Sequence, residues 1–116
     1  MIDVDTRLPA HLEISGLIRQ VQIEGGFAAV LKKGERDAGT ILIVITEGGA
    51  NSRIYERMPQ LDGTRAWHCS LSQDSENKQE FESYIERRGG QDPDLWIVEL
   101  DIARGERFIG LAANPS

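Results

Sequence analysis

The chain has 116 residues, 40% of them hydrophobic, which is the size and composition of one folded domain that needs no metal or disulfide cross-link. We therefore expect a single domain over residues 1–116. The net charge is −6, and residues 74–94 hold seven acidic and three basic residues. Such an acidic surface repels phosphate backbones and anionic lipids, so we expect no nucleic-acid and no membrane binding.

The sequence also indicates a reducing compartment. Its single cysteine, Cys69, has no internal partner for a disulfide. The first residues lack the basic start and apolar run of a secretory signal. The longest unbroken aliphatic stretch, residues 41–45, is far shorter than the roughly 20 residues that span a bilayer. We expect a cytoplasmic protein.

The first predicted element is a helix over about residues 9–24. Apolar residues recur there at helical spacing, and Gly25-Gly26 follows the last turn. Gly16 lies inside this helix, where glycine lowers helix stability relative to alanine. We expect Gly16 to allow close packing of the helix on a sheet.

Four strand-like runs follow, separated by short, turn-rich links. They cover residues 27–33, 40–47, 52–58 and 65–71. Links this short favour hairpins, so the pattern predicts a four-stranded antiparallel meander. The second run is aliphatic at both odd and even positions, as expected for a central strand that is covered on both faces.

A second helix is predicted over about residues 75–88, beginning at a cap from Asp74 or Ser75 and ending near Gly89-Gly90. Its apolar stripe is thin, consisting of Phe81, Tyr84 and Ile85. A fifth strand over residues 95–101 and a short last helix with Phe108 and Ile109 complete the chain. The fold class is therefore α+β in the order α-β-β-β-β-α-β-α, with helices packed on the sheet. The fifth strand can flank the first or the fourth, and we favour the first.

Four stretches of the sequence carry a family resemblance. They are RLPAHLE at residues 7–13, GFAAVL at 26–31, YERMPQLDG at 55–63 and QDPDLWIVE at 91–99. Together they resemble a family of short alphaproteobacterial proteins, the domain-of-unknown-function family numbered 1491, over nearly the whole chain. The resemblance implies a bacterial, cytoplasmic origin, and it transfers no catalytic residue.

Metal and cofactor chemistry have little support in the sequence. The cysteine and the two histidines, at positions 11, 68 and 69, lack the paired spacings of a zinc site. No phosphate-binding glycine motif is present. We predict no metal and no cofactor.

His68 and Cys69 are neighbours, which raises the question of a nucleophile pair. In a strand their side chains point to opposite faces, so the imidazole does not reach the thiol. Cys69 is then expected to be a small core residue. A hydrolase that uses His68 would need a distant carboxylate, which nothing in the sequence marks, so we lean against an enzyme without excluding one.

Strand register suggests one candidate site. If residues 59–64 close a tight hairpin, Arg57 lies opposite Ala66, Tyr55 opposite His68, and Arg53 opposite Ser70. Trp67 and Cys69 then face the core with Ile54 on the other side of the sheet. We hypothesise that four residues form a shallow pocket for a carboxylate, a phosphate or an acidic side chain of a partner: Arg53, Tyr55, Arg57 and His68.

The alternative for these arginines is pairing with the chain's own carboxylates. The second predicted helix could supply them through its four glutamates, Glu76, Glu80, Glu82 and Glu86. We favour this structural role over anion binding.

Taken together, the sequence favours a noncatalytic protein-interaction module. It could form a homodimer through a sheet edge or an aromatic patch, or bind an unidentified protein partner. A small anionic-ligand binder is the alternative. Trp67 and Trp96 are expected to lie mainly in the core, and the exposure of Leu61 is the observation that would point to a contact patch.

Overall fold

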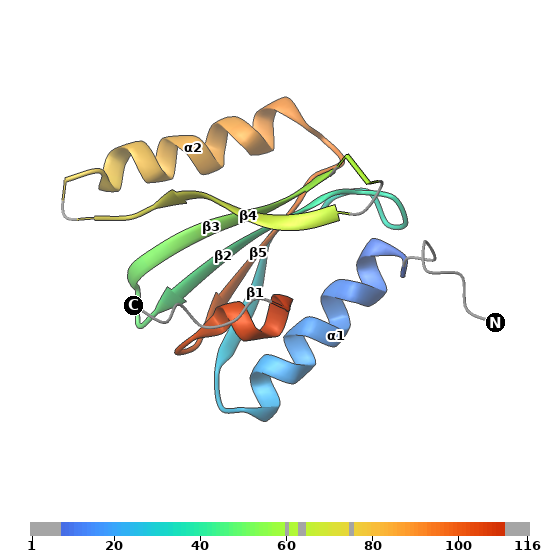
Figure 1. The fold of residues 1–116 in the computed structure, drawn as a ribbon, viewed down its shortest axis with the longest axis horizontal. Helices are drawn as coiled ribbons and strands as arrows, with labels where there is room; N and C mark the ends of the chain where they lie inside the picture. The colour runs from blue at the N-terminus through green and yellow to red at the C-terminus, as the bar shows by residue number, and fades with distance from the viewer. Residues whose placement is uncertain (1–7, 60, 63–64, 75, 111–116) are drawn as a thin grey trace.

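Five strands form one mixed sheet that lies between two layers of helix (Figure 1). The computed structural model describes residues 8–59, 61–62, 65–74 and 76–110. The elements are α1 (Ala10–Ile23), β1 (Phe27–Lys32), β2 (Ile41–Glu47), β3 (Ala50–Pro59), β4 (Arg65–Ser72), α2 (Lys78–Gln91), β5 (Trp96–Asp101) and the 3-10 helix η1 (Gly105–Ile109). The predicted α+β class and the predicted element order are confirmed.

The strand order differs from the predicted meander. It is β1-β5-β2-β3-β4, so β5 lies between β1 and β2 instead of at an edge. β5 pairs antiparallel with β1 and parallel with β2, whereas β2, β3 and β4 form the predicted antiparallel hairpins. The favoured neighbour of the last strand, β1, is therefore confirmed, whereas the predicted β1–β2 hairpin and an edge position of the last strand are wrong.

The segment between β1 and β2 explains the error, because it passes across the start of β5 instead of closing a hairpin. Trp96 donates from its indole Nε1 to the Glu35 carbonyl at 2.6 Å, and the Glu35 amide donates to the Asp94 carbonyl at 3.0 Å. A Cβ at Gly34 or Gly39 would lie 2.2 or 2.4 Å from the Asp94 carbonyl oxygen. The two glycines thus permit a contact between backbones that any side chain would block.

Each face of the sheet carries its own hydrophobic core. The face toward α1 and η1 buries Ile41, Ile43, Ile45, Trp96, Val98 and Leu100 against Ile14 and Val21. The face toward α2 buries Leu42, Val44, Ile54, Leu95 and Ile97 against Phe81. β2 is buried on both faces, which confirms its prediction as a central strand, and the thin stripe of α2 is confirmed as well.

Two details of the helices depart from the sequence predictions. A Cβ at Gly16 would meet no atom within 4 Å, so Gly16 does not mediate the expected close packing. The second helix begins at Lys78 and continues through Gly89 to Gln91. Gly89 lies inside this helix, where a Cβ would come 3.3 Å from the Lys32 side chain and 3.4 Å from that of Ile97, so the glycine allows close packing on the sheet. Of the two predicted caps, Asp74 binds the amides of Glu76 and Asn77 ahead of the helix, and Ser75 lies outside the described residues.

No helix in the described part of the chain is both long and apolar enough to cross a membrane.

Candidate functional site

The four residues of the predicted anion pocket do not share one face of the sheet. Arg57 pairs with Trp67, Glu56 with His68, and Tyr55 with Cys69. The predicted register is wrong by one residue, because Pro59 pairs with Arg65 and the connection is one residue shorter than assumed. A shift of one residue moves Trp67, His68 and Cys69 to the opposite face, whereas beyond the register shift between Ile54 and Tyr55, Leu71 lies opposite Ile54, on the predicted face.

This shift separates His68 from the other three residues. His68 lies with Glu56 on the face toward α2, whereas Arg53, Tyr55 and Arg57 face α1 and η1. Trp67 and Cys69 share the latter face. Trp67 is half-buried, which places it only partly in the core, and Cys69 is an exposed free thiol, so its prediction as a core residue is wrong.

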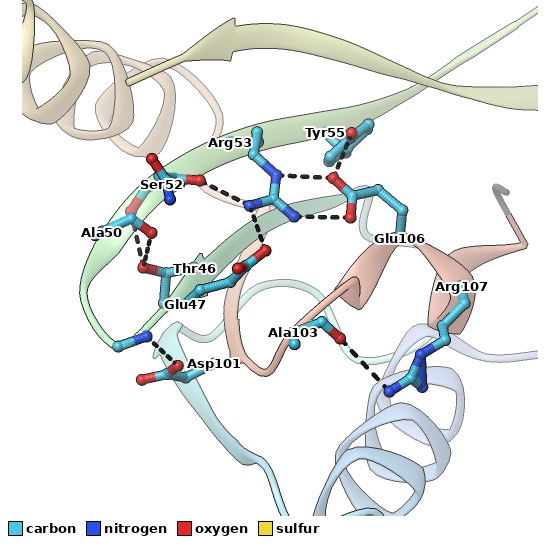
Figure 2. A network of polar contacts seen from close by, with 12 residues as sticks. Thr46, Glu47, Ala50, Ser52, Arg53, Tyr55, Asp101, Ala103, Glu106 and Arg107 are labelled. Carbon is cyan, nitrogen blue, oxygen red and sulfur yellow. Dashed lines mark hydrogen bonds and ion pairs between the residues drawn. The ribbon is translucent and has the colours of Figure 1, made fainter. Parts of the chain in front are cut away.

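Arg53 and Tyr55 converge on one carboxylate, Glu106 of η1 (Figure 2). Arg53 donates from Nε and Nη2 to the two Glu106 oxygens, both at 2.7 Å, and Tyr55 donates from its hydroxyl at 2.8 Å. Arg53 Nη1 also contacts Glu47 at 3.2 Å and the Asn51 carbonyl at 2.8 Å. We call Arg53, Tyr55 and Glu106 the Glu106 cluster.

The Glu106 cluster shifts the pKa of each member. Burial alone would raise the pKa of Glu106, but hydrogen bonds from Arg53 and Tyr55 outweigh it and leave that pKa lowered. The same hydrogen bond raises the pKa of Arg53. Burial, followed by the hydrogen bond to Glu106, raises the pKa of Tyr55 to about 12. At neutral pH the cluster therefore holds an ion pair and a neutral phenol.

Arg57 binds a different carboxylate, Glu13 of α1. Its Nη1 and Nη2 donate to the two Glu13 oxygens at 2.7 and 2.9 Å, and its guanidinium lies 4.7 Å from the centroid of the Trp67 ring. Its buried Nε has no hydrogen-bond partner in the part of the chain that the structure describes. Both arginines thus pair with the protein's own carboxylates, as favoured from the sequence, but the partners are Glu13 and Glu106 and not the glutamates of α2.

A second buried carboxylate, Glu56, lies on the opposite face of β3 and was not identified from the sequence. It accepts hydrogen bonds from Ser70 at 2.6 Å, from Arg88 Nε at 2.8 Å, and from the Tyr84 hydroxyl. These donors outweigh the effect of burial and lower the pKa of Glu56. The available signals were a glutamate between Tyr55 and Arg57 in a buried strand, and Tyr84 and Arg88 one turn apart on α2. We call Glu56, Ser70, Tyr84 and Arg88 the Glu56 cluster.

The Glu106 cluster opens onto a polar cavity of about 450 Å³. Its lining residues are Glu47, Arg53, Tyr55, Cys69, Ser72, Arg104 and Glu106. The Cys69 thiol lies 3.5 Å from the Ser72 hydroxyl, and His68 points to the other face as the sequence predicted. The described residues therefore place no imidazole beside this thiol. They also contain no cluster of three or more residues suited to hold a metal ion.

Comparisons with known proteins agree with this fold. The chain is 28% identical to a DUF1491 family protein from Caulobacter crescentus CB15 in its crystal structure, with a TM-score of 0.78 and coverage of 90% of this chain and 96% of the other. A solution structure of an A. tumefaciens protein is 29% identical, with a TM-score of 0.74 and coverage of 96% and 99%. An NMR structure of a DUF1491 family protein from C. crescentus is also 29% identical, with a TM-score of 0.75 and coverage of 89% and 93%.

No curated protein matches the chain. The family model described as "Protein of unknown function (DUF1491)" matches residues 8–110, most of the sequence. The family resemblance seen in the sequence is thus confirmed, and the chain belongs to the DUF1491 family of proteins of unknown function.

Proposed function

We propose that this protein is a noncatalytic interaction module, and that it pairs with a second copy through the outer edge of β1. The observation that supports this proposal is the exposure of apolar side chains along that edge. Phe27 is 75% exposed, Leu31 52% and Val30 43%, and Ile23 at the end of α1 is 74% exposed beside them. An edge strand with such side chains is a template for pairing with another strand.

The other edge of the sheet lacks this character. On β4, the exposed side chains His68, Cys69 and Ser70 are polar or small, and the strand is kinked by a register shift at Ser70. Polar residues and bulges of this kind discourage pairing between edges. β1 also has a register shift, after Val30, but its exposed residues up to Leu31 carry no charge. The proposal therefore uses β1.

An antiparallel pair of β1 strands brings opposite charges together. In a two-fold arrangement the C-terminal end of one strand lies beside the N-terminal end of the other. Lys33, which follows β1, would approach Glu24, which precedes it, in the second copy. Because both residues are exposed, this attraction adds orientation more than affinity.

The test is light scattering after size-exclusion chromatography over a concentration series. We expect the mass to rise from 12.9 kDa toward that of a dimer, and Phe27→Lys to keep the protein monomeric, because a charge would be buried in the paired edge. Leu61 in the β3–β4 connection is fully exposed as well, which is the observation named above for a contact patch, so the matched control is Ser83→Lys, at an exposed position of α2. A wild-type protein that stays monomeric up to about 1 mM, or a Phe27→Lys variant that dimerises equally, would rule out the β1 pairing.

Small-anion binding stays a prediction and is the second candidate. Its support is that Arg53 lines the polar cavity together with Arg104, whose guanidinium makes no hydrogen bond or ion pair among the described residues. An anion would have to compete with Glu106 for Arg53. Amide shifts near residues 53–57 on phosphate titration, stronger in Glu106→Gln, would support it. Unchanged shifts in both proteins would remove this candidate.

We further propose that the protein works in a reducing cytoplasm. Cys69 is a free thiol and is exposed, and such a thiol persists where reductants keep it from forming intermolecular disulfides. Trapping thiols in intact cells before lysis tests this proposal, since extensive oxidation of Cys69 in the native host would contradict it.

A further inference from the structure

An apolar cavity of about 310 Å³ lies between α1, β4 and η1, on the face of the sheet that carries the Glu106 cluster. Its walls are mainly hydrophobic and include Leu12, Leu17, Ile43, Trp67, Phe108 and Ile109. None of its lining residues lies on β1, so it is separate from the proposed pairing edge. Cavities of this size with apolar walls and few polar groups are the usual form of small-molecule sites.

The cavity exists because α1 does not cover the whole sheet. The helix packs against β1, β5 and η1, while β4 lies at the far edge of the sheet (Figure 1). Trp67 of β4 and Ile43 of β2 line the cavity together with Leu12 and Leu17 of α1. The aromatic ring of Phe108 on η1 lines the same space.

Gly16 gives the cavity an opening. It lies in the middle of α1 and lines the cavity, and a Cβ built on it meets no atom within 4 Å. Glycine inside a helix lowers its stability, and neither a positive φ nor a close backbone contact requires glycine at this position. Packing does not explain the glycine at position 16, whereas an unobstructed path into the apolar cavity does.

The polar groups at the cavity select the kind of ligand. Glu13 and Gln20 are its polar lining residues. The Glu13 carboxylate is held by Arg57 but retains lone pairs for a further donor, and the exposed Gln20 amide has no partner among the described residues. With the charge of Arg57 already engaged and a net charge of −6 on the chain, the site disfavours an anionic head group.

We propose that this cavity binds a small amphiphile with an apolar body and a hydrogen-bond donor at one end, such as an aliphatic alcohol or amine. The apolar body lies against Trp67 and Phe108, and the donor reaches Glu13 or Gln20 at the rim. Burial of the apolar body supplies most of the affinity, and the rim fixes its direction. This site is independent of strand pairing at β1.

The experiment titrates the full chain with 1-decanol, decylamine and decanoate while following tryptophan fluorescence. Trp67 lines the cavity, whereas Trp96 is buried elsewhere with its indole bound to Glu35, so the change reports on Trp67. We expect saturable binding of decanol and decylamine and at least tenfold weaker binding of decanoate. No saturable change with either of the first two would overturn the site, and equal affinity for decanoate would overturn the donor preference.

Substitutions in α1 locate the binding. Gly16→Leu places a side chain in the opening and is expected to weaken decanol binding at least tenfold, while its helix becomes more stable, so misfolding does not explain the loss. Gln22→Leu places the same side chain at an exposed position of α1 outside the cavity and is expected to bind as the wild type does. Equal binding by the two variants would contradict the assignment to this cavity.

Discussion

The two buried carboxylates on opposite faces of β3 are built from the same parts. Glu106 holds Arg53 and Tyr55, and Glu56 holds Arg88 and Tyr84 together with Ser70. They differ in what they join: the Glu106 cluster fixes η1 to β3, whereas the Glu56 cluster ties α2 to both β3 and β4. In this fold, a buried carboxylate that binds an arginine and a tyrosine therefore holds a helix to the sheet on each face.

The comparison predicts that the Glu56 cluster contributes more stability. Glu56→Gln removes the charge that faces three donors, and α2 has only one fully buried side chain, Phe81, to hold it otherwise. We expect a loss of about 2–3 kcal/mol at neutral pH. Glu106→Gln should cost about 1–2 kcal/mol, because Arg53 keeps its contacts with Glu47 and the Asn51 carbonyl. Urea unfolding measures both, and a larger loss in Glu106→Gln would reverse the comparison.

Acid should weaken both clusters. The pKa of Glu56 and that of Glu106 are lowered from the ordinary value of 4.5, so the unfolded chain binds more protons than the folded chain near that pH. Their contribution is therefore present above about pH 4.5 and is lost as the pH falls through the folded pKa values. The urea midpoint should fall from neutral pH to about pH 3.5, and it should fall less in the double Gln variant, which has lost both groups. An equal fall in the two proteins would assign acid sensitivity to other carboxylates.

The central strand and the sheet edges show how far the sequence predicts this fold. The aliphatic run of β2 predicted a central strand because both of its faces must be covered, and that was confirmed. β5 carries a similar signal: Ile97 on one face and Trp96 and Val98 on the other are all buried. The short links between the four preceding strands favoured hairpins throughout, which left only edge positions for the fifth strand. Pairing between strands that are far apart in the sequence leaves no local sequence pattern. The insertion of β5 between β1 and β2 was therefore not predicted.

The candidate site was predictable only in part. Alternation correctly placed Arg53, Tyr55 and Arg57 on one face of β3, because a strand has a period of two. His68 was placed on the wrong face because the β3–β4 connection was assumed to be one residue longer than it is. The carboxylates that neutralise the arginines are 44 residues away in the case of Glu13 and 53 residues away in the case of Glu106, so no spacing rule identifies them.

The smallest predicted effect concerns the ionisation of the tyrosine in each cluster. The chain has two tyrosines, and one belongs to each cluster, so phenolate absorbance in Tyr84→Phe reports Tyr55 alone. We expect that absorbance to rise near pH 12, well above the ordinary value of 10.0, because burial and the neighbouring Glu106 charge both disfavour the phenolate. The stability that follows from this shift is present below about pH 10 and is lost as the pH rises toward 12.

Removing one carboxylate should then affect one tyrosine only. Adding Glu106→Gln to the Tyr84→Phe protein should lower the Tyr55 pKa, since a charge beside the phenol is gone, although burial still keeps that pKa raised. Glu56→Gln in the same background should leave the Tyr55 titration unchanged, because Glu56 lies on the other face of β3 and shares no hydrogen bond with it. If Glu56→Gln shifted the Tyr55 titration as much as Glu106→Gln does, the sheet would transmit changes between its two faces. The Glu56 cluster and the Glu106 cluster would then have to be treated as one unit.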